Sequence, residues 1–115
     1  MENTELIKVT DKVRELIAES PSAPPGRLSE ILVELSSLNS TLSEELNDIL
    51  IFKPEKMLEL KEAHKTIKEA EWNWDASKEG KKETWLKSWL LRIKENKSAI
   101  KTRLQIIHDE SFGQY

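Results

Sequence analysis

The sequence predicts an all-α protein of long antiparallel helices that pack as a coiled-coil-like helical bundle. Hydrophobic residues make up 37% and charged residues 34% of the 115-residue chain, a balance typical of long amphipathic helices. Only three glycines and four prolines are available to form turns, and Pro21, Pro24 and Pro25 fall in one short stretch. Leucine and isoleucine recur every seven residues in two separate segments, which is the spacing of a coiled-coil seam. We expect one domain whose packing is completed by oligomerisation.

The first helix is predicted at residues 4–19, where Leu6, Val9, Val13 and Leu16 recur at steps of three and four. A proline-rich segment then breaks the helix, because each proline lacks an amide donor and has a fixed φ. The chain therefore divides into an N-terminal helix at 1–20, a proline-rich linker at 21–26, a bundle core at 27–110 and a tail at 111–115.

A second helix is predicted from residue 26 or 27 to residue 52. Its seam repeats at seven and consists of Leu28, Leu35, Leu42 and Ile49. Its other face is small and polar, with residues Ser36, Ser37, Asn39, Ser40, Thr41 and Ser43. Such a face is either solvated, closely approached by another backbone, or a binding site. Pro54 is expected to open the third helix, where a missing amide costs nothing.

The course of the chain at Gly80 is the main alternative in the fold. A turn at Gly80 would give helices at 54–78 and 81–109 and a monomeric three-helix bundle. A continuous helix at 54–109 would be about 84 Å long. We favour the continuous helix, because a turn would leave Lys81 and Lys82 in an uncapped first turn, whereas one glycine costs only about 1 kcal/mol. Half of such a rod would need a second chain, which predicts a homo-oligomer.

The C-terminal third of the chain carries the second seam. It consists of Leu86, Ile93, Ile100, Leu104 and Ile107. Lys97 is the one polar residue in this seam, and such a residue can fix the register or the number of chains.

Positive charge is concentrated at residues 76–103. This segment holds nine basic and three acidic residues, a net charge of +6, within a chain of net charge −3. A local field of this kind determines what a surface attracts. It also holds two of the four tryptophans.

On a continuous helix, six residues would share one flank, and we take them as the candidate ligand-binding or anion-binding site: Trp74, Lys78, Lys81, Trp85, Arg92 and Arg103. An indole can stack on a base while a neighbouring cation neutralises phosphate. The alternative is structural, since tryptophans anchor cores and basic residues flank seams. Lys87, Lys94 and Lys101 line the opposite flank.

Signatures of an enzyme, a cofactor or a membrane protein are not found in the sequence. There is no cysteine, and neither His64 nor His108 has a glutamate three residues earlier. No phosphate-binding loop or nucleophile elbow is present, so we expect no catalytic residues, metal or cofactor. No apolar run reaches the length of a membrane span, and no signal peptide is evident. We expect a cytoplasmic protein.

The C-terminal two thirds of the chain resemble small all-helical early-region proteins of tailed phages and prophages, whose function is unassigned. The resemblance is carried by LSEEL at 42–46, KPE at 53–55, KEAE at 68–71 with Trp74, AS at 76–77 with Gly80, KE at 82–83, SAIKTRL at 98–104 and GQY at 113–115. It implies a phage origin and a role in the host cytoplasm. It implies no reaction.

Three functions follow from these observations. The first is a non-enzymatic phage oligomer that binds nucleic acid or a partner protein through the tryptophan and basic flank. The second is a counter-defence protein that sequesters a host nucleotide signal or inhibits a host defence protein. The third is a scaffold without a ligand.

Overall fold

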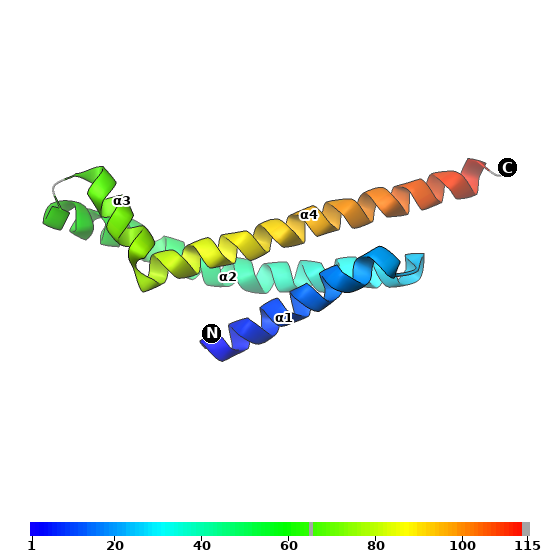
Figure 1. Ribbon diagram of the computed structural model, residues 1–115, viewed down its shortest axis with the longest axis horizontal. Coiled ribbons are helices and arrows are strands. Elements are labelled where there is room, and N and C mark those ends of the chain that lie inside the picture. Colours follow the sequence, from blue (N-terminus) through cyan, green and yellow to red (C-terminus); the bar gives the residue numbers. More distant parts are fainter. Residues whose placement is uncertain (65, 114–115) are drawn as a thin grey trace.

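The computed structural model describes residues 1–64 and 66–113, and the regular structure in these ranges is entirely helical. The elements in order are α1 (Asn3–Glu19), the short 3-10 helix η1 (Ser20–Ser22), α2 (Pro25–His64), α3 (Ile67–Ala76) and α4 (Lys78–Gly113). Figure 1 shows α2 running antiparallel to both α1 and α4 in an elongated molecule of 68 × 28 × 19 Å. The predicted all-α helical bundle is therefore confirmed.

The turn between α1 and α2 is held by an ion pair between these two helices and by hydrogen bonds from α4. Ser20–Ser22 form η1, Ala23 is buried, and α2 already begins at Pro25 within the expected linker. Arg27 forms a hydrogen-bonded ion pair with Glu19 across the turn, and this hydrogen bond lowers the pKa of the Glu19 carboxyl. From α4, Arg103 Nη1 donates to the carbonyl oxygens of Ser20 and Pro21 at 2.8 and 3.0 Å.

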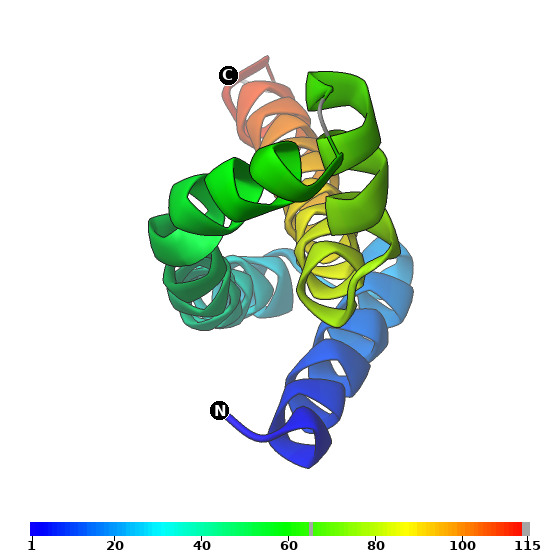
Figure 2. The same ribbon diagram turned by 90° about the vertical axis from the view of Figure 1, so that its left-hand side faces the viewer.

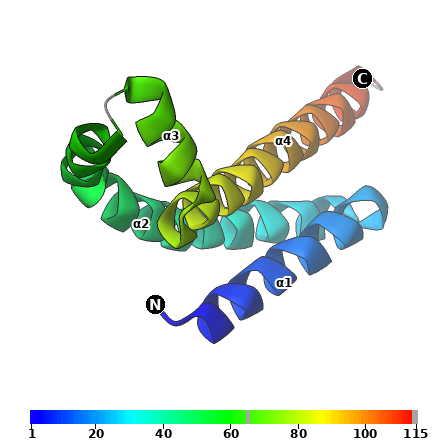
Figure 3. The ribbon, with the colours of Figure 1, turned by 60° about the vertical axis from the view of Figure 1, so that its left-hand side comes forward.

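Pro54 lies inside α2, so the prediction that it opens a third helix is wrong. A proline has no amide hydrogen for the carbonyl four residues earlier, here that of Leu50. Both residues are exposed, so water can reach this carbonyl. Figures 2 and 3 show that α2 bends in its C-terminal part toward α3, as expected for a helix that continues past a proline.

The favoured continuous helix at 54–109 is also wrong, because the chain changes direction twice within it. α2 ends at His64, and α3 begins after Thr66, whose hydroxyl accepts a hydrogen bond from the amide of Glu69 at 3.1 Å. The second change of direction is at Ser77, three residues before Gly80. The segment predicted as one helix is consequently divided among α2, α3 and α4.

Ser77 is both the C-terminal cap of α3 and the residue that precedes the first turn of α4. Its amide donates to the carbonyl of Trp74 at 2.9 Å, and its hydroxyl accepts from the amide of Gly80 at 3.0 Å. Ser77 is therefore the cap that the first turn of α4 needs. A Cβ atom placed on Gly80 would lie 1.8 Å from the carbonyl oxygen of Trp74, so a larger residue does not fit at this corner.

The predicted seam residues form the core of a single chain. Those that are buried are Leu28, Leu35, Leu42, Ile49, Leu86, Ile93 and Ile100. Leu104 packs against this core while partly exposed, and Ile107 is half-buried. Figure 1 shows that the C-terminal end of α4 extends beyond the α1–α2 turn. Because the chain changes direction after α2 and again after α3, the described residues do not form the long rod for which a second chain was expected. Homo-oligomerisation stays a prediction, which light scattering can test.

The expected tail at 111–115 begins within α4, which continues to Gly113, and residues 114–115 lie outside the described residues. The side chain of His64 also lies outside them.

Candidate functional site

The structure separates the six predicted flank residues into four environments. Lys78, Lys81 and Trp85 stay together on the side of α4 that faces α1. Arg92 lies further along the same side, and Arg103 is used to hold the α1–α2 turn. Trp74 belongs to α3 and is buried at 1% exposure, so it cannot contact a ligand. Trp74 lies apart from the other predicted site residues because the chain changes direction at Ser77.

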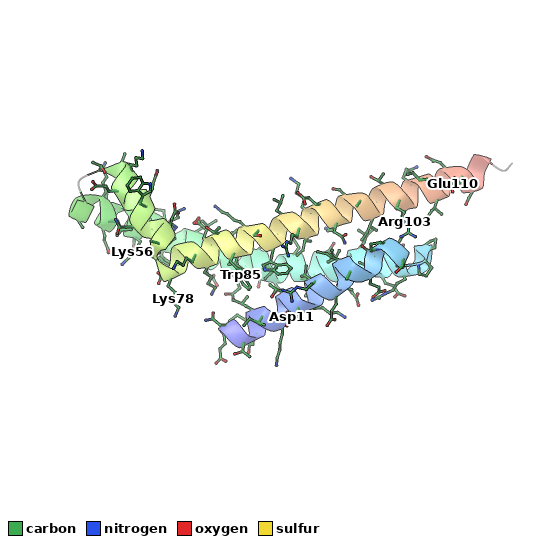
Figure 4. All side chains as sticks on the ribbon, in the orientation of Figure 1. Asp11, Lys56, Lys78, Trp85, Arg103 and Glu110 are labelled. Atoms are coloured by element: carbon green, nitrogen blue, oxygen red, sulfur yellow. The ribbon has the colours of Figure 1, made fainter. Side chains whose placement is uncertain are left out.

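A groove of about 480 Å³ lies between the start of α1 and the start of α4, and we call it the α1/α4 groove. Its lining residues are Asn3, Leu6, Ile7, Lys78, Lys81, Lys82 and Trp85. Trp85 is half-buried, and Figure 4 shows it between the ribbons of α4 and α1. Three ammonium groups and one indole thus line a partly apolar groove that contains no carboxylate.

The charge of the α1/α4 groove is only partly neutralised by the protein. Lys82 Nζ lies 3.3 Å from a carboxylate oxygen of Glu45, which also pairs with the N-terminal amine of Met1 at 3.2 Å. Within residues 1–64 and 66–113, Lys78 and Lys81 make no ion pair. Both lie in the first turn of α4, where the partial positive charge of the helix N-terminus adds to theirs. The groove is therefore suited to an anion.

A second recess of about 380 Å³ continues along the same two helices toward the α1–α2 turn. Here the guanidinium groups of Arg14 and Arg92 lie 5.5 and 4.8 Å from the centre of the Trp89 ring. Trp89 makes cation–π contacts with both arginines and is only 6% exposed, so little of its ring is accessible to a ligand. Arg14, which was not predicted from sequence, is thus part of the basic surface between α1 and α4.

Glu83 is the centre of a buried polar network beneath the α3–α4 corner. Lys53 Nζ donates to both of its oxygens at 2.8 and 3.0 Å, Trp74 Nε1 donates at 3.0 Å, and Lys87 Nζ donates at 3.2 Å. Burial alone would raise the pKa of this carboxyl, but the hydrogen bonds outweigh it and lower the pKa from 4.5 to about 2. Glu83 therefore stays ionised and fixes Trp74 in the core. Neither its burial nor its partners were predicted from sequence.

Other classes of site are not supported by the described part of the chain. No group of three or more histidine and acidic residues there is placed to hold a metal ion. No described helix is long and apolar enough to cross a membrane.

Comparison with protein-family models, curated proteins and solved structures finds no match. The resemblance to phage early-region proteins therefore stays a prediction.

Proposed function

We propose that this protein is a non-catalytic nucleic-acid-binding protein and that the α1/α4 groove holds a single strand. Trp85 would stack on one base, while Lys78 and Lys81 would neutralise the adjacent phosphates. The observation that carries the proposal is the composition of the groove. It presents one accessible indole and two ammonium groups that pair with no carboxylate in the described part of the chain, and none of its lining residues is acidic.

The geometry restricts the aromatic contribution to Trp85. Trp74 is buried in the core and Trp89 lies between two arginines, whereas Trp72, exposed at 63%, is on α3 outside the groove. One stacked base contributes about 1–3 kcal/mol, which is about 5- to 150-fold in affinity. Binding at this groove should thus be moderate, tolerant of base identity and sensitive to salt.

The test is fluorescence anisotropy with a labelled single-stranded oligonucleotide, measured across a range of salt concentrations. Trp85→Ala should weaken binding by 5-fold or more, while Trp72→Ala, the matched control, should leave it unchanged. Lys78→Gln/Lys81→Gln should reduce the slope of log affinity against log salt by about 1.4, because each phosphate contact with a single strand contributes about 0.7. Lys12→Gln/Lys61→Gln removes the same charge from exposed positions elsewhere and should have little effect.

Equal losses in the two double variants would show that binding depends on net charge and not on the groove. A mononucleotide that binds as tightly as the oligonucleotide would instead support sequestration of a nucleotide signal. If the phage resemblance reflects common origin, strand binding would serve phage DNA metabolism in the host cytoplasm.

A further inference from the structure

A second groove, lined mainly by polar residues, lies between α2 and α4, and we call it the α2/α4 groove. It has a volume of about 630 Å³. Its polar lining residues are Asn39 and Ser43 from α2 and Lys94, Lys97, Ser98 and Lys101 from α4. Lys94 follows Trp85 by nine residues, which is two and a half helical turns, so the two grooves lie on opposite sides of α4. The second groove is therefore a separate site.

The three lysines of the α2/α4 groove have no counterion among residues 1–64 and 66–113. None of the eight lining residues is acidic, and no carboxylate among the described residues pairs with Lys94, Lys97 or Lys101. By contrast, Lys53 and Lys87 are both paired with Glu83. Like charges three or four residues apart on a helix destabilise it by a few tenths of a kcal/mol per pair, about 0.2–0.5. The cluster thus lowers stability without any compensation from the folded chain.

The uncharged polar groups of the α2/α4 groove are also unused. The hydroxyls of Ser36, Ser40 and Thr41, which do not line the groove, donate to backbone carbonyls of α2. Asn39 and Ser43, which do line it, make no hydrogen bond with any described residue. Hydrogen-bond donors from α2 therefore face three ammonium groups from α4, and all of them are available to a ligand.

We propose that the α2/α4 groove binds two or three consecutive phosphate groups. Lys94, Lys97 and Lys101 span about 10.5 Å of helix axis, and a stacked strand places about three phosphates in that length, at 3.4 Å each. Asn39 and Ser43 donate to the phosphate oxygens from the facing wall. None of the residues that line the groove is aromatic, so the groove recognises phosphate groups and offers no ring on which a base could stack. Its ligand is a nucleic-acid backbone or a free oligophosphate, which share this chemistry.

The experiment uses the full chain carrying Lys78→Gln/Lys81→Gln, so that the α1/α4 groove does not contribute. Inorganic tripolyphosphate and a 12-nucleotide oligothymidylate are each titrated in a calorimeter. Adding Lys94→Gln/Lys97→Gln/Lys101→Gln should weaken binding of at least one of them by 10-fold or more. Loss for both means that the groove accepts phosphates from either source, and loss for the oligonucleotide alone assigns the nucleic-acid backbone.

The matched control replaces Lys8, Lys12 and Lys61, which are exposed lysines outside both grooves, with glutamine. The proposal is overturned if this control loses as much affinity as the groove variant, or if the groove variant stays within twofold of its parent for both probes. Exposed Lys94 and Lys101 can also be changed singly, which provides a test should the triple variant fold poorly. The result is independent of the α1/α4 groove, whose failure would appear as unchanged oligonucleotide binding in Trp85→Ala.

Discussion

Replacement of Gly80 by alanine distinguishes between two courses of the chain, a turn at Ser77 and a straight helix through Gly80. In a straight helix the substitution would stabilise the protein by about 1 kcal/mol, because alanine is the better helix former. In the structure the new Cβ atom would lie 1.8 Å from Trp74 O and 2.6 Å from Trp74 C. Both atoms are backbone, so relief requires α3 and α4 to move apart.

The expected loss is at the upper end of the range for overpacking, about 2–3 kcal/mol. For a chain of this size, that corresponds to a fall in melting temperature of about 8–12 °C. Gly26→Ala is the matched control, since a Cβ atom there would meet nothing within 4 Å. Its expected effect is a gain of up to about 1 kcal/mol. Thermal and urea unfolding followed by circular dichroism measure both. If Gly80→Ala is as stable as the parent, the close approach at the corner is not real.

Three further predictions concern the same corner. Ser77→Ala should cost about 1 kcal/mol by removing the cap on the Gly80 amide, whereas Ser88→Ala, at an exposed position on α4, should be neutral in urea titrations. Glu83→Gln should cost about 2–4 kcal/mol because it leaves the Lys53 ammonium without its buried partner, and exposed Glu79→Gln should cost far less in the same assay. The lowered pKa of Glu83 contributes about 3 kcal/mol that is fully present above pH 5 and is lost as the pH falls toward 2. The free energy of unfolding should therefore fall less steeply with decreasing pH in Glu83→Gln than in the parent protein. An unchanged pH dependence would argue against an ionised Glu83.

The sequence predicts the parts of the fold that depend on periodicity. The seven-residue repeats from Leu28 to Ile49 and from Leu86 to Ile100 identify the buried faces of α2 and α4. Local capping patterns predict the starts of helices less well than the repeats predict their buried faces. Thr66 with Glu69 matches the same capping pattern as Thr41 with Glu44, but only the first begins a helix, while the Thr41 hydroxyl bonds back to Ser37.

Two local rules were misleading. A proline after a helical segment predicts a new helix start, yet at Pro54 an exposed carbonyl and a bend allow α2 to continue. A turn at Gly80 itself would leave Lys81 without a cap, whereas the turn at Ser77 provides one three residues earlier.

The candidate site was predictable where it depends on α4 alone. Lys78, Lys81 and Trp85 share one side of this helix because of their spacing, and the structure keeps them together. Trp74 and Arg103 could not be assigned in this way. The partner of Trp74 is determined by the corner, and Arg103 bonds to Ser20, which is 83 residues away in sequence. Contacts between residues so far apart in sequence depend on how the helices pack together. The spacing of residues within one helix does not predict that packing.

Because a single residue joins α3 to α4, the rotation of α4 about its own axis is fixed by the conformation of that residue. One additional residue beside Ser77 would turn α4 by about 100° about its own axis. Glu83 would then point away from the Trp74 indole, and the lysines of both grooves would face different neighbours. Insertions at this junction should consequently be far more damaging than insertions of the same length at the free C-terminal end of α4.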